Sequence, residues 1–230
     1  MAPDAEPRPL AVITGASSGI GLELARQLAE EGYDLVIAAE DGELDDATAE
    51  LRSTGASVEA VLGDLGTGEG VDALATRILD LGRPPDALVV NAGIGVNGAF
   101  VDTDLEAQLQ VVELNVAGAV RLTGLVLPSM VGRGAGRVMF TSSIAATMAG
   151  PYMATYNASK AFLYSFSQSL RQELEDAGIT VTALMPGPTD TEFFERAGME
   201  DTMLGQTKRD DAAKVARQGI KGMLAGKDHV

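Results

Sequence analysis

The chain has 230 residues, and its 33 acidic and 17 basic side chains give a formal net charge of −16 at pH 7. Hydrophobic residues make up 46% and charged residues 22%, which is an ordinary globular mixture and excludes intrinsic disorder. Nucleic-acid and membrane-surface binding both depend on clustered Lys and Arg, so the acidic excess disfavours both. We expect no nucleic acid and no membrane among the partners.

Cysteine is absent, and histidine occurs once, at His229. The chain can therefore form neither a disulfide framework nor a thiolate nucleophile, and we expect no metal site. Residues 1–9 are proline-rich and are not followed by a long apolar stretch. We predict a flexible tail there, no transmembrane segment, and a soluble cytoplasmic protein.

From Leu10 onward, short apolar runs alternate with longer amphipathic ones. The apolar runs predict six buried strands at 10–14, 35–39, 58–62, 87–91, 137–141 and 180–185. The amphipathic runs predict helices at about 19–31, 43–54, 67–81, 104–130, 154–177 and 210–224. Strands that alternate with helices indicate the α/β class, with a doubly wound parallel sheet covered on both faces. We predict a single domain over 10–230, with a substrate-loop region at about 190–207.

The first predicted strand leads into the first predicted helix through the sequence TGASSGIG. In such a loop one glycine makes the turn, one lets the backbone approach a pyrophosphate, and one packs the helix against the strand. The N–H groups at the start of the helix then face the phosphates. The alternative is an ordinary glycine-rich turn. The predicted cofactor residues of the loop are Gly15, Ser17, Ser18, Gly19, Ile20 and Gly21.

Glu40 follows the second predicted strand, at the distance from the glycine loop where a carboxylate can bind a ribose. Its carboxylate would accept a hydrogen bond from the ribose 2′-hydroxyl and would repel a 2′-phosphate, and Ser18 offers no compensating charge. Glu40 thus favours NAD(H) over NADP(H). The alternative is a solvated residue that begins the acidic face of the next helix.

Tyr156 and Lys160 are four residues apart in a predicted helix, so their side chains share one face. Ser143 closes the fifth predicted strand, at the carboxyl end of the sheet where open α/β folds bind ligands. We expect the Lys160 ammonium to lower the pKa of Tyr156 toward neutral pH, so that the phenol can act as a general acid. Ser143 would donate a hydrogen bond to the substrate oxygen. The alternative is an ordinary surface helix that carries a Tyr and a Lys.

Together these motifs resemble the short-chain dehydrogenase/reductase family, from about Leu10 to Lys221. The resemblance implies a Rossmann-type fold and the catalytic set Asn115, Ser143, Tyr156 and Lys160. In the family the asparagine shapes a helix and holds a proton-relay water. The resemblance also implies cofactor contacts at Asp64, Leu65, Asn91, Ala92, Gly93, Tyr156, Lys160, Pro186, Gly187, Thr189 and Thr191.

Two features depart from the family pattern. Ala39 ends the second predicted strand, where NAD-dependent relatives usually carry Asp, and Glu40 stands one residue later. Relatives usually have a seventh strand after the last helix, and here that strand is missing or only begun at 226–230. The cofactor preference for NAD(H) therefore rests on charge.

The resemblance implies an NAD(P)-dependent oxidoreductase that transfers hydride between the nicotinamide and a carbonyl or secondary alcohol carbon. The alternative is a catalytically silent dinucleotide-binding regulator on the same fold. The substrate is expected to be an apolar ketone or alcohol, unless half of the apolar loop residues only pack beneath the loops. The resemblance also implies a homodimer or homotetramer. The predicted substrate-lining residues are Ile94, Ala145, Met148, Met153, Phe193 and Phe194, in loops that also carry Met199, Met203 and Leu204.

Overall fold

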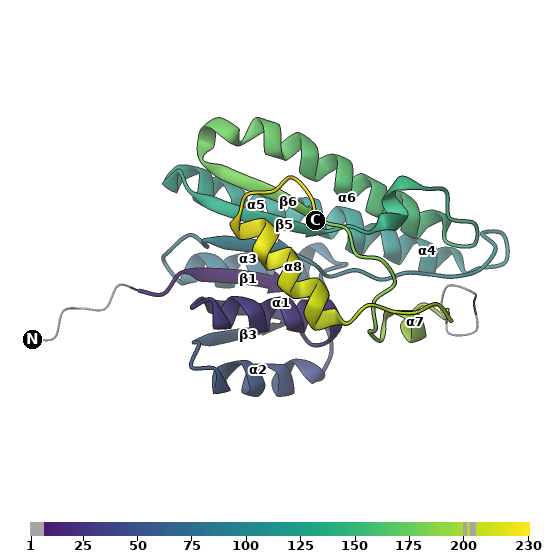
Figure 1. Ribbon diagram of the computed structural model, residues 1–230, viewed down its shortest axis with the longest axis horizontal. Coiled ribbons are helices and arrows are strands. Elements are labelled where there is room, and N and C mark those ends of the chain that lie inside the picture. The colour runs from purple at the N-terminus through teal and green to yellow at the C-terminus, as the bar shows by residue number, and fades with distance from the viewer. Residues whose placement is uncertain (1–6, 200–201, 203–205) are drawn as a thin grey trace, which may run out of the picture.

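A computed structural model describes residues 7–199, 202 and 206–230, and its centre is a six-stranded parallel sheet (Figure 1). The strand order is β3-β2-β1-β4-β5-β6. The chain therefore builds outward from β1 on one side and from β4 on the other, which leaves a crevice between their carboxyl ends. The predicted α/β class is confirmed. The strands are β1 (Leu10–Thr14), β2 (Asp34–Ala39), β3 (Val58–Leu62), β4 (Ala87–Val90), β5 (Gly136–Thr141) and β6 (Ile179–Leu184).

The central strands are apolar at successive positions because both of their faces are covered. Every residue of β1 and of β4 is buried. Val12 of β1 pairs in register with Val36 on one side and Leu88 on the other. A parallel sheet enclosed by helices has no solvated face, so its strands show continuous apolar runs in place of alternation.

Two apolar clusters cover the two faces of the sheet. Leu24, Leu51 and Ile220, from α1, α2 and α8, pack on one face, and Leu74 and Leu122 belong to the cluster of α3, α5 and α6 on the other. In Figure 1 the yellow α8 lies beside the purple α1, on the side opposite α6. The helices are α1 (Gly19–Glu30), α2 (Glu43–Ser53), α3 (Gly68–Asp80), α4 (Leu105–Val112), the π-helix η1 (Glu113–Gly118), α5 (Ala119–Arg133), the 3₁₀ turn η2 (Ile144–Thr147), α6 (Ala154–Glu173), the 3₁₀ turn η3 (Glu175–Ala177), α7 (Phe193–Arg196) and α8 (Ala212–Leu224).

The predicted single helix at 104–130 is instead three consecutive segments, α4, η1 and α5. The π-helical turn of η1 contains Asn115, whose side chain accepts a hydrogen bond from Ile94 N and donates one to Ile94 O, both at 2.9 Å. Next to it, the backbone of Gly118 runs so close to Leu65 that an added Cβ would lie 2.2 Å from the Leu65 carbonyl oxygen. These contacts to distant segments set the wider turn, which helical periodicity does not encode.

The end of the chain adds to the edge of the sheet. Ala183 N donates to Asp228 O at 2.9 Å, and Val230 N donates to Ala183 O at 2.9 Å, so the last residues run parallel to β6. The seventh strand is thus begun. Residues 1–6 of the predicted tail lie outside the described residues, and Arg8 donates to the carbonyl of Gly32 at 2.8 Å.

Candidate functional site

A cavity of about 590 Å³ lies at the carboxyl ends of the strands, where the strand order reverses. In an open α/β sheet this is the position at which ligands bind. The glycine loop after β1 lines one end, and the start of α6 and the segment before and within α7 line the other. The loop and the Tyr156–Lys160 pair, which the sequence places far apart, therefore open onto one space.

The glycine loop folds as its spacing predicts. Gly15 and Gly19 have positive φ angles of 64° and 55°, in the left-handed region that favours glycine. A Cβ on Gly21 would lie 1.8 Å from the Gly15 carbonyl oxygen, so only glycine fits there. The side chain of Ser18, the N-cap of α1, accepts no hydrogen bond from the helix, and the first turn of α1 carries no acidic residue, so its N–H groups suit a phosphate. The loop fits the pyrophosphate of a dinucleotide.

At the ribose end of the cavity, the two carboxylates of Glu40 and Asp41 differ in exposure. Glu40 is exposed, whereas Asp41 Oδ2 accepts a hydrogen bond from Ser17 Oγ at 3.0 Å. Asp41 Oδ1 is buried and has no hydrogen-bond partner among the described residues. A buried acceptor without a donor suits a ribose hydroxyl, so Asp41 joins Glu40, which also lines the cavity, as a candidate for this role.

Asp64 and Leu65, the pair predicted to contact the cofactor, have different roles in the structure. Leu65 lines the cavity, and Asp64 is not among the lining residues. Asp64 Oδ1 instead accepts a hydrogen bond from Gly66 N at 2.8 Å and holds the loop before α3. The motif therefore positions the loop through Asp64 and offers the cavity only Leu65.

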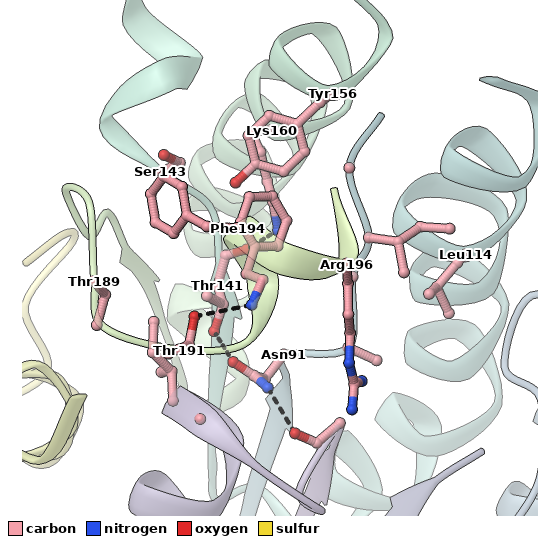
Figure 2. A pocket seen from close by; sticks show the side chains of 18 of the residues that line it. Asn91, Leu114, Thr141, Ser143, Tyr156, Lys160, Thr189, Thr191, Phe194 and Arg196 are labelled. Atoms are coloured by element: carbon pink, nitrogen blue, oxygen red, sulfur yellow. Dashed lines mark hydrogen bonds between the residues drawn. The ribbon is translucent and has the colours of Figure 1, made fainter. Parts of the chain in front are cut away.

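A row of hydrogen bonds joins the two ends of the cavity (Figure 2). Lys160 Nζ donates to Thr141 O at 2.8 Å, and Thr141 Oγ1 donates to Asn91 Oδ1 at 3.0 Å. Asn91 Nδ2 in turn donates to the carbonyls of Thr14 and Gly15. The motif that ends β4 therefore braces the glycine loop against the strand that precedes Ser143.

The electrostatics of Tyr156 differ from the sequence expectation. Burial raises the pKa of Tyr156 to about 12, an effect that a hydrogen bond with Ser143 opposes. Burial also lowers the pKa of Lys160 to about 8. The expectation that Lys160 brings the pKa of Tyr156 toward neutral is wrong for this structure. The physical reason is that both groups are desolvated, and the Lys160 ammonium hydrogen-bonds the Thr141 carbonyl.

Asn115 lies behind the cavity and not in its lining. Its side chain is fully buried and holds Ile94 through two hydrogen bonds, and it donates a third to Ser159 Oγ at 3.0 Å. Ser159 Oγ in turn donates to the Tyr156 carbonyl at 2.7 Å. Asn115 thus ties the β4 end to α6 and positions Tyr156 through the backbone.

On the substrate side, all six predicted lining residues border the cavity. The Phe193 ring packs on Tyr156 with 5.1 Å between ring centroids. Met153, Phe194 and Met199 are buried in one apolar cluster, so packing accounts for part of this set. Met148 is 59% exposed. Met203 and Leu204 lie outside the described residues.

Ser143 and all the predicted cofactor residues except Asp64 border the cavity, from the glycine loop to the segment after β6. The structure adds lining residues outside the predicted set, which come from the ends of the strands, from α4 and η1, from the loop before α6 and its first turn, and from the segment around α7. They include Asp41, Gly63, Gly95, Val96, Ala107, Gln110, Leu114, Thr141, Ser142, Gly150, Pro151, Asn157, Pro188, Glu192 and Arg196.

The fold and this site define a Rossmann-type dinucleotide-binding protein. A family model described as short chain dehydrogenase matches residues 9–201. The chain therefore belongs to the short-chain dehydrogenase/reductase family.

Known proteins support this assignment over different lengths. The chain is 36% identical over 191 residues to a probable oxidoreductase, EphD, of Mycobacterium tuberculosis. The aligned region covers 82% of this chain and 32% of that protein. The chain thus spans about a third of that relative. A short-chain dehydrogenase from Sphingobium yanoikuyae in complex with NADPH has a TM-score of 0.90 and 32% identity, over 96% of this chain and 87% of the other.

A substrate complex is also similar. L-Sorbose reductase from Gluconobacter frateurii, complexed with NADPH and L-sorbose, has a TM-score of 0.86 and 29% identity, over 97% of this chain and 95% of the other. Similar proteins of the family thus bind small-molecule substrates together with a phosphorylated dinucleotide. These complexes support NAD(P) for this chain and show no preference for NAD(H).

Proposed function

We propose that this chain interconverts a carbonyl and a secondary alcohol with NAD(P)(H), using Tyr156 as the general acid and base. The observation that carries the proposal is the meeting of Tyr156, Lys160 and Ser143 at one end of a cavity whose other end is the glycine loop. When bound, the cofactor supplies or accepts the hydride. The side chains of this chain supply orientation, charge and the proton.

The phenol of Tyr156 is suited to donate a proton to a developing alkoxide. Because its pKa is raised to about 12, it is protonated across the physiological range. The Ser143 hydroxyl lies beside it and can hydrogen-bond the substrate oxygen where negative charge develops. The Lys160 ammonium, 5.7 Å from the centre of the Tyr156 ring, stabilises the phenolate that remains after proton transfer.

We propose that the ribose end prefers NAD(H). Its support is the buried Oδ1 of Asp41, which can accept a hydrogen bond from a 2′-hydroxyl but repels a 2′-phosphate. The exposed carboxylate of Glu40 adds negative charge to the same end. Under this proposal the two carboxylates disfavour, without excluding, the phosphorylated cofactor.

We propose an apolar ketone or alcohol as the substrate. Phe193, Met148 and Ile94 border the cavity, and the ring of Phe193 packs on Tyr156. Apolar walls with a small number of placed polar groups are typical of pockets that bind such ligands.

The proposal is tested by following absorbance at 340 nm while ketones and alcohols are screened with NADH, NADPH and their oxidised forms. We expect turnover of at least one apolar ketone, and we expect Tyr156→Phe to lower kcat by a factor of about 10³ or more while NADH binding changes little. A wild-type rate in Tyr156→Phe would show that another group moves the proton. NADH binding without turnover of any compound would favour the silent regulator.

We also propose that the chain forms a homodimer through α4, α5 and α6. Leu105, Leu109, Leu125 and Phe162 on these helices are all more than a third exposed. The run Leu105–Arg133 is long and apolar enough to cross a membrane by composition, yet it packs in the layer with α3 and α6. Burial of its exposed side against a second copy would remove apolar surface from water. Light scattering measures the mass directly.

A further inference from the structure

A guanidinium from the substrate side of the cavity reaches the ribose end. Arg196, the last residue of α7, lines the cavity. Its Nη1 lies 3.6 Å from Asp41 Oδ2, and its Nη2 lies 3.7 Å from Glu43 Oε2 and 2.7 Å from Glu192 Oε2. Figure 2 shows the side chain running from α7 toward the floor of the cavity, where Asn91 lies. One short helix therefore carries both Phe193, which packs on Tyr156, and a cation at the cofactor end.

Arg196 brings a positive charge to the ribose end of the cavity, where the other described lining side chains are neutral or acidic. Among the described residues that line the cavity, the basic ones are Lys160 and Arg196. Lys160 is held at the other end by the Thr141 carbonyl. The side chains facing the ribose position from the glycine loop and from the end of β2 are hydroxyls and carboxylates, namely Ser17, Ser18, Glu40 and Asp41.

The donors of Arg196 are not all committed to the protein. A guanidinium has five N–H groups, and the Glu192 contact has hydrogen-bond length, whereas those to Asp41 and Glu43 exceed it. The side chain is 49% exposed and is thus accessible to a ligand in the cavity. A planar guanidinium with unused donors matches a phosphate, which accepts two parallel hydrogen bonds from it.

We propose that Arg196 is a cofactor-specificity residue that binds the 2′-phosphate of NADP(H), so that this acidic ribose end takes NADP(H) as well as NAD(H). The proposal rests on the proposed NAD(P)-dependent function and adds to it the group that distinguishes the two cofactors. Asp41 receives the 2′-hydroxyl of NAD(H), and Arg196 offsets its charge when the 2′-phosphate is present. Without Arg196, the pocket accepts the ribose with its free 2′-hydroxyl, as in NAD(H), and disfavours the 2′-phosphate of NADP(H).

Two small probes isolate the 2′-phosphate, because 5′-AMP and 2′,5′-ADP differ by that group alone. We expect calorimetric titration to show that Arg196→Ala weakens 2′,5′-ADP binding about tenfold or more and changes 5′-AMP binding less than twofold. Arg217→Ala, which removes an exposed arginine of α8, is the charge-matched control and should leave both affinities unchanged. Asp41→Asn should strengthen 2′,5′-ADP binding, because one repelling charge is lost.

The possible results separate this proposal from the proposed function. Equal weakening of both probes by Arg196→Ala would place the guanidinium on the 5′-phosphate and would overturn the proposal, although the dinucleotide site would stand. Equal effects of Arg196→Ala and Arg217→Ala would reduce the role to overall charge and would also overturn it. If wild-type protein bound neither probe, the NAD(P)-dependent function itself would fail. Circular dichroism of each variant establishes that the fold is retained.

Discussion

Lys160 lies one helical turn from Tyr156, with its Nζ 5.7 Å from the centre of the tyrosine ring, and it donates to the Thr141 carbonyl at 2.8 Å. Burial raises the pKa of Tyr156 to about 12 and lowers that of Lys160 to about 8. Desolvation disfavours the charged form of both groups, which is why the pKa of the phenol rises while that of the ammonium falls. Of the two groups, Lys160 therefore has the pKa nearer to neutral pH.

The buried lysine makes stability depend on pH. Unfolded lysine titrates at an ordinary pKa of 10.5 and Lys160 at about 8, so between these values the unfolded state binds more protons and stability rises with pH. The gain is complete above 10.5 and is lost as pH falls through 8. We expect the free energy of unfolding of wild type, relative to that of Lys160→Met, to rise by about 3 kcal/mol as the pH increases from 8 to 10.5. Urea denaturation at each pH measures it.

An exposed lysine provides the matched control for that experiment. Lys214 of α8 is exposed and pairs with Asp210, so Lys214→Met should show no comparable change between pH 8 and 10.5. A pH-independent difference between wild type and Lys160→Met would mean that Lys160 is solvated and has an ordinary pKa.

Asn115 is expected to stabilise the fold around the site. Its buried side chain satisfies both backbone groups of Ile94 and also hydrogen-bonds Ser159. We expect Asn115→Ala to cost about 3 kcal/mol in free energy of unfolding, because it leaves several polar groups without partners. Ser159→Ala breaks only one of the three contacts of Asn115 and should cost about 1 kcal/mol. Equal costs in chemical denaturation would argue that Asn115 does not hold Ile94 in place.

The fold was predictable where local pattern and burial coincide. The strands fall within one residue of the predicted bounds, because apolar runs such as Leu10–Thr14 are enclosed on both faces. The π-helical turn at Glu113–Gly118 was not predictable, because it depends on contacts of Asn115 and Gly118 with segments far away in the chain. Helical periodicity carries no record of such contacts.

The candidate site was predictable from motifs only where a motif marks the residue. The glycine loop and the Tyr156–Lys160 pair were found because their spacing reflects a turn or one helix face. Arg196 and Asp41 lie 155 positions apart in the sequence, and no local sequence pattern predicts that they come together. The spacing of Tyr156 and Lys160 also says nothing about burial, which controls both pKa values.

Gly21 is expected to tolerate no side chain. Its added Cβ would lie 1.8 Å from the Gly15 carbonyl oxygen, so Gly21→Ala must displace the glycine loop. We expect a loss of at least about 2 kcal/mol in free energy of unfolding, together with loss of nucleotide binding. Gly124→Ala is the control, since an added Cβ there meets no described atom within 4 Å inside α5, and alanine should stabilise that helix by up to about 1 kcal/mol. If both substitutions were neutral, the loop would be looser than the structure shows.

Phe193 is expected to limit the size of the substrate. Its ring packs on Tyr156, and an added Cβ on Gly95 would lie 2.8 Å from Phe193 Cζ, so the ring fills the space beside the reactive phenol. Phe193→Ala should raise kcat/KM for a bulky ketone about tenfold relative to a small one, because the ring no longer occupies that volume. It should also lower the pKa of Tyr156 by admitting water, which the absorbance of tyrosinate at 295 nm reports. Phe162→Ala, which removes a ring of α6 stacked on Phe166, is the control and should change neither quantity. An unchanged ratio in Phe193→Ala would mean that the substrate enters from another side of the cavity.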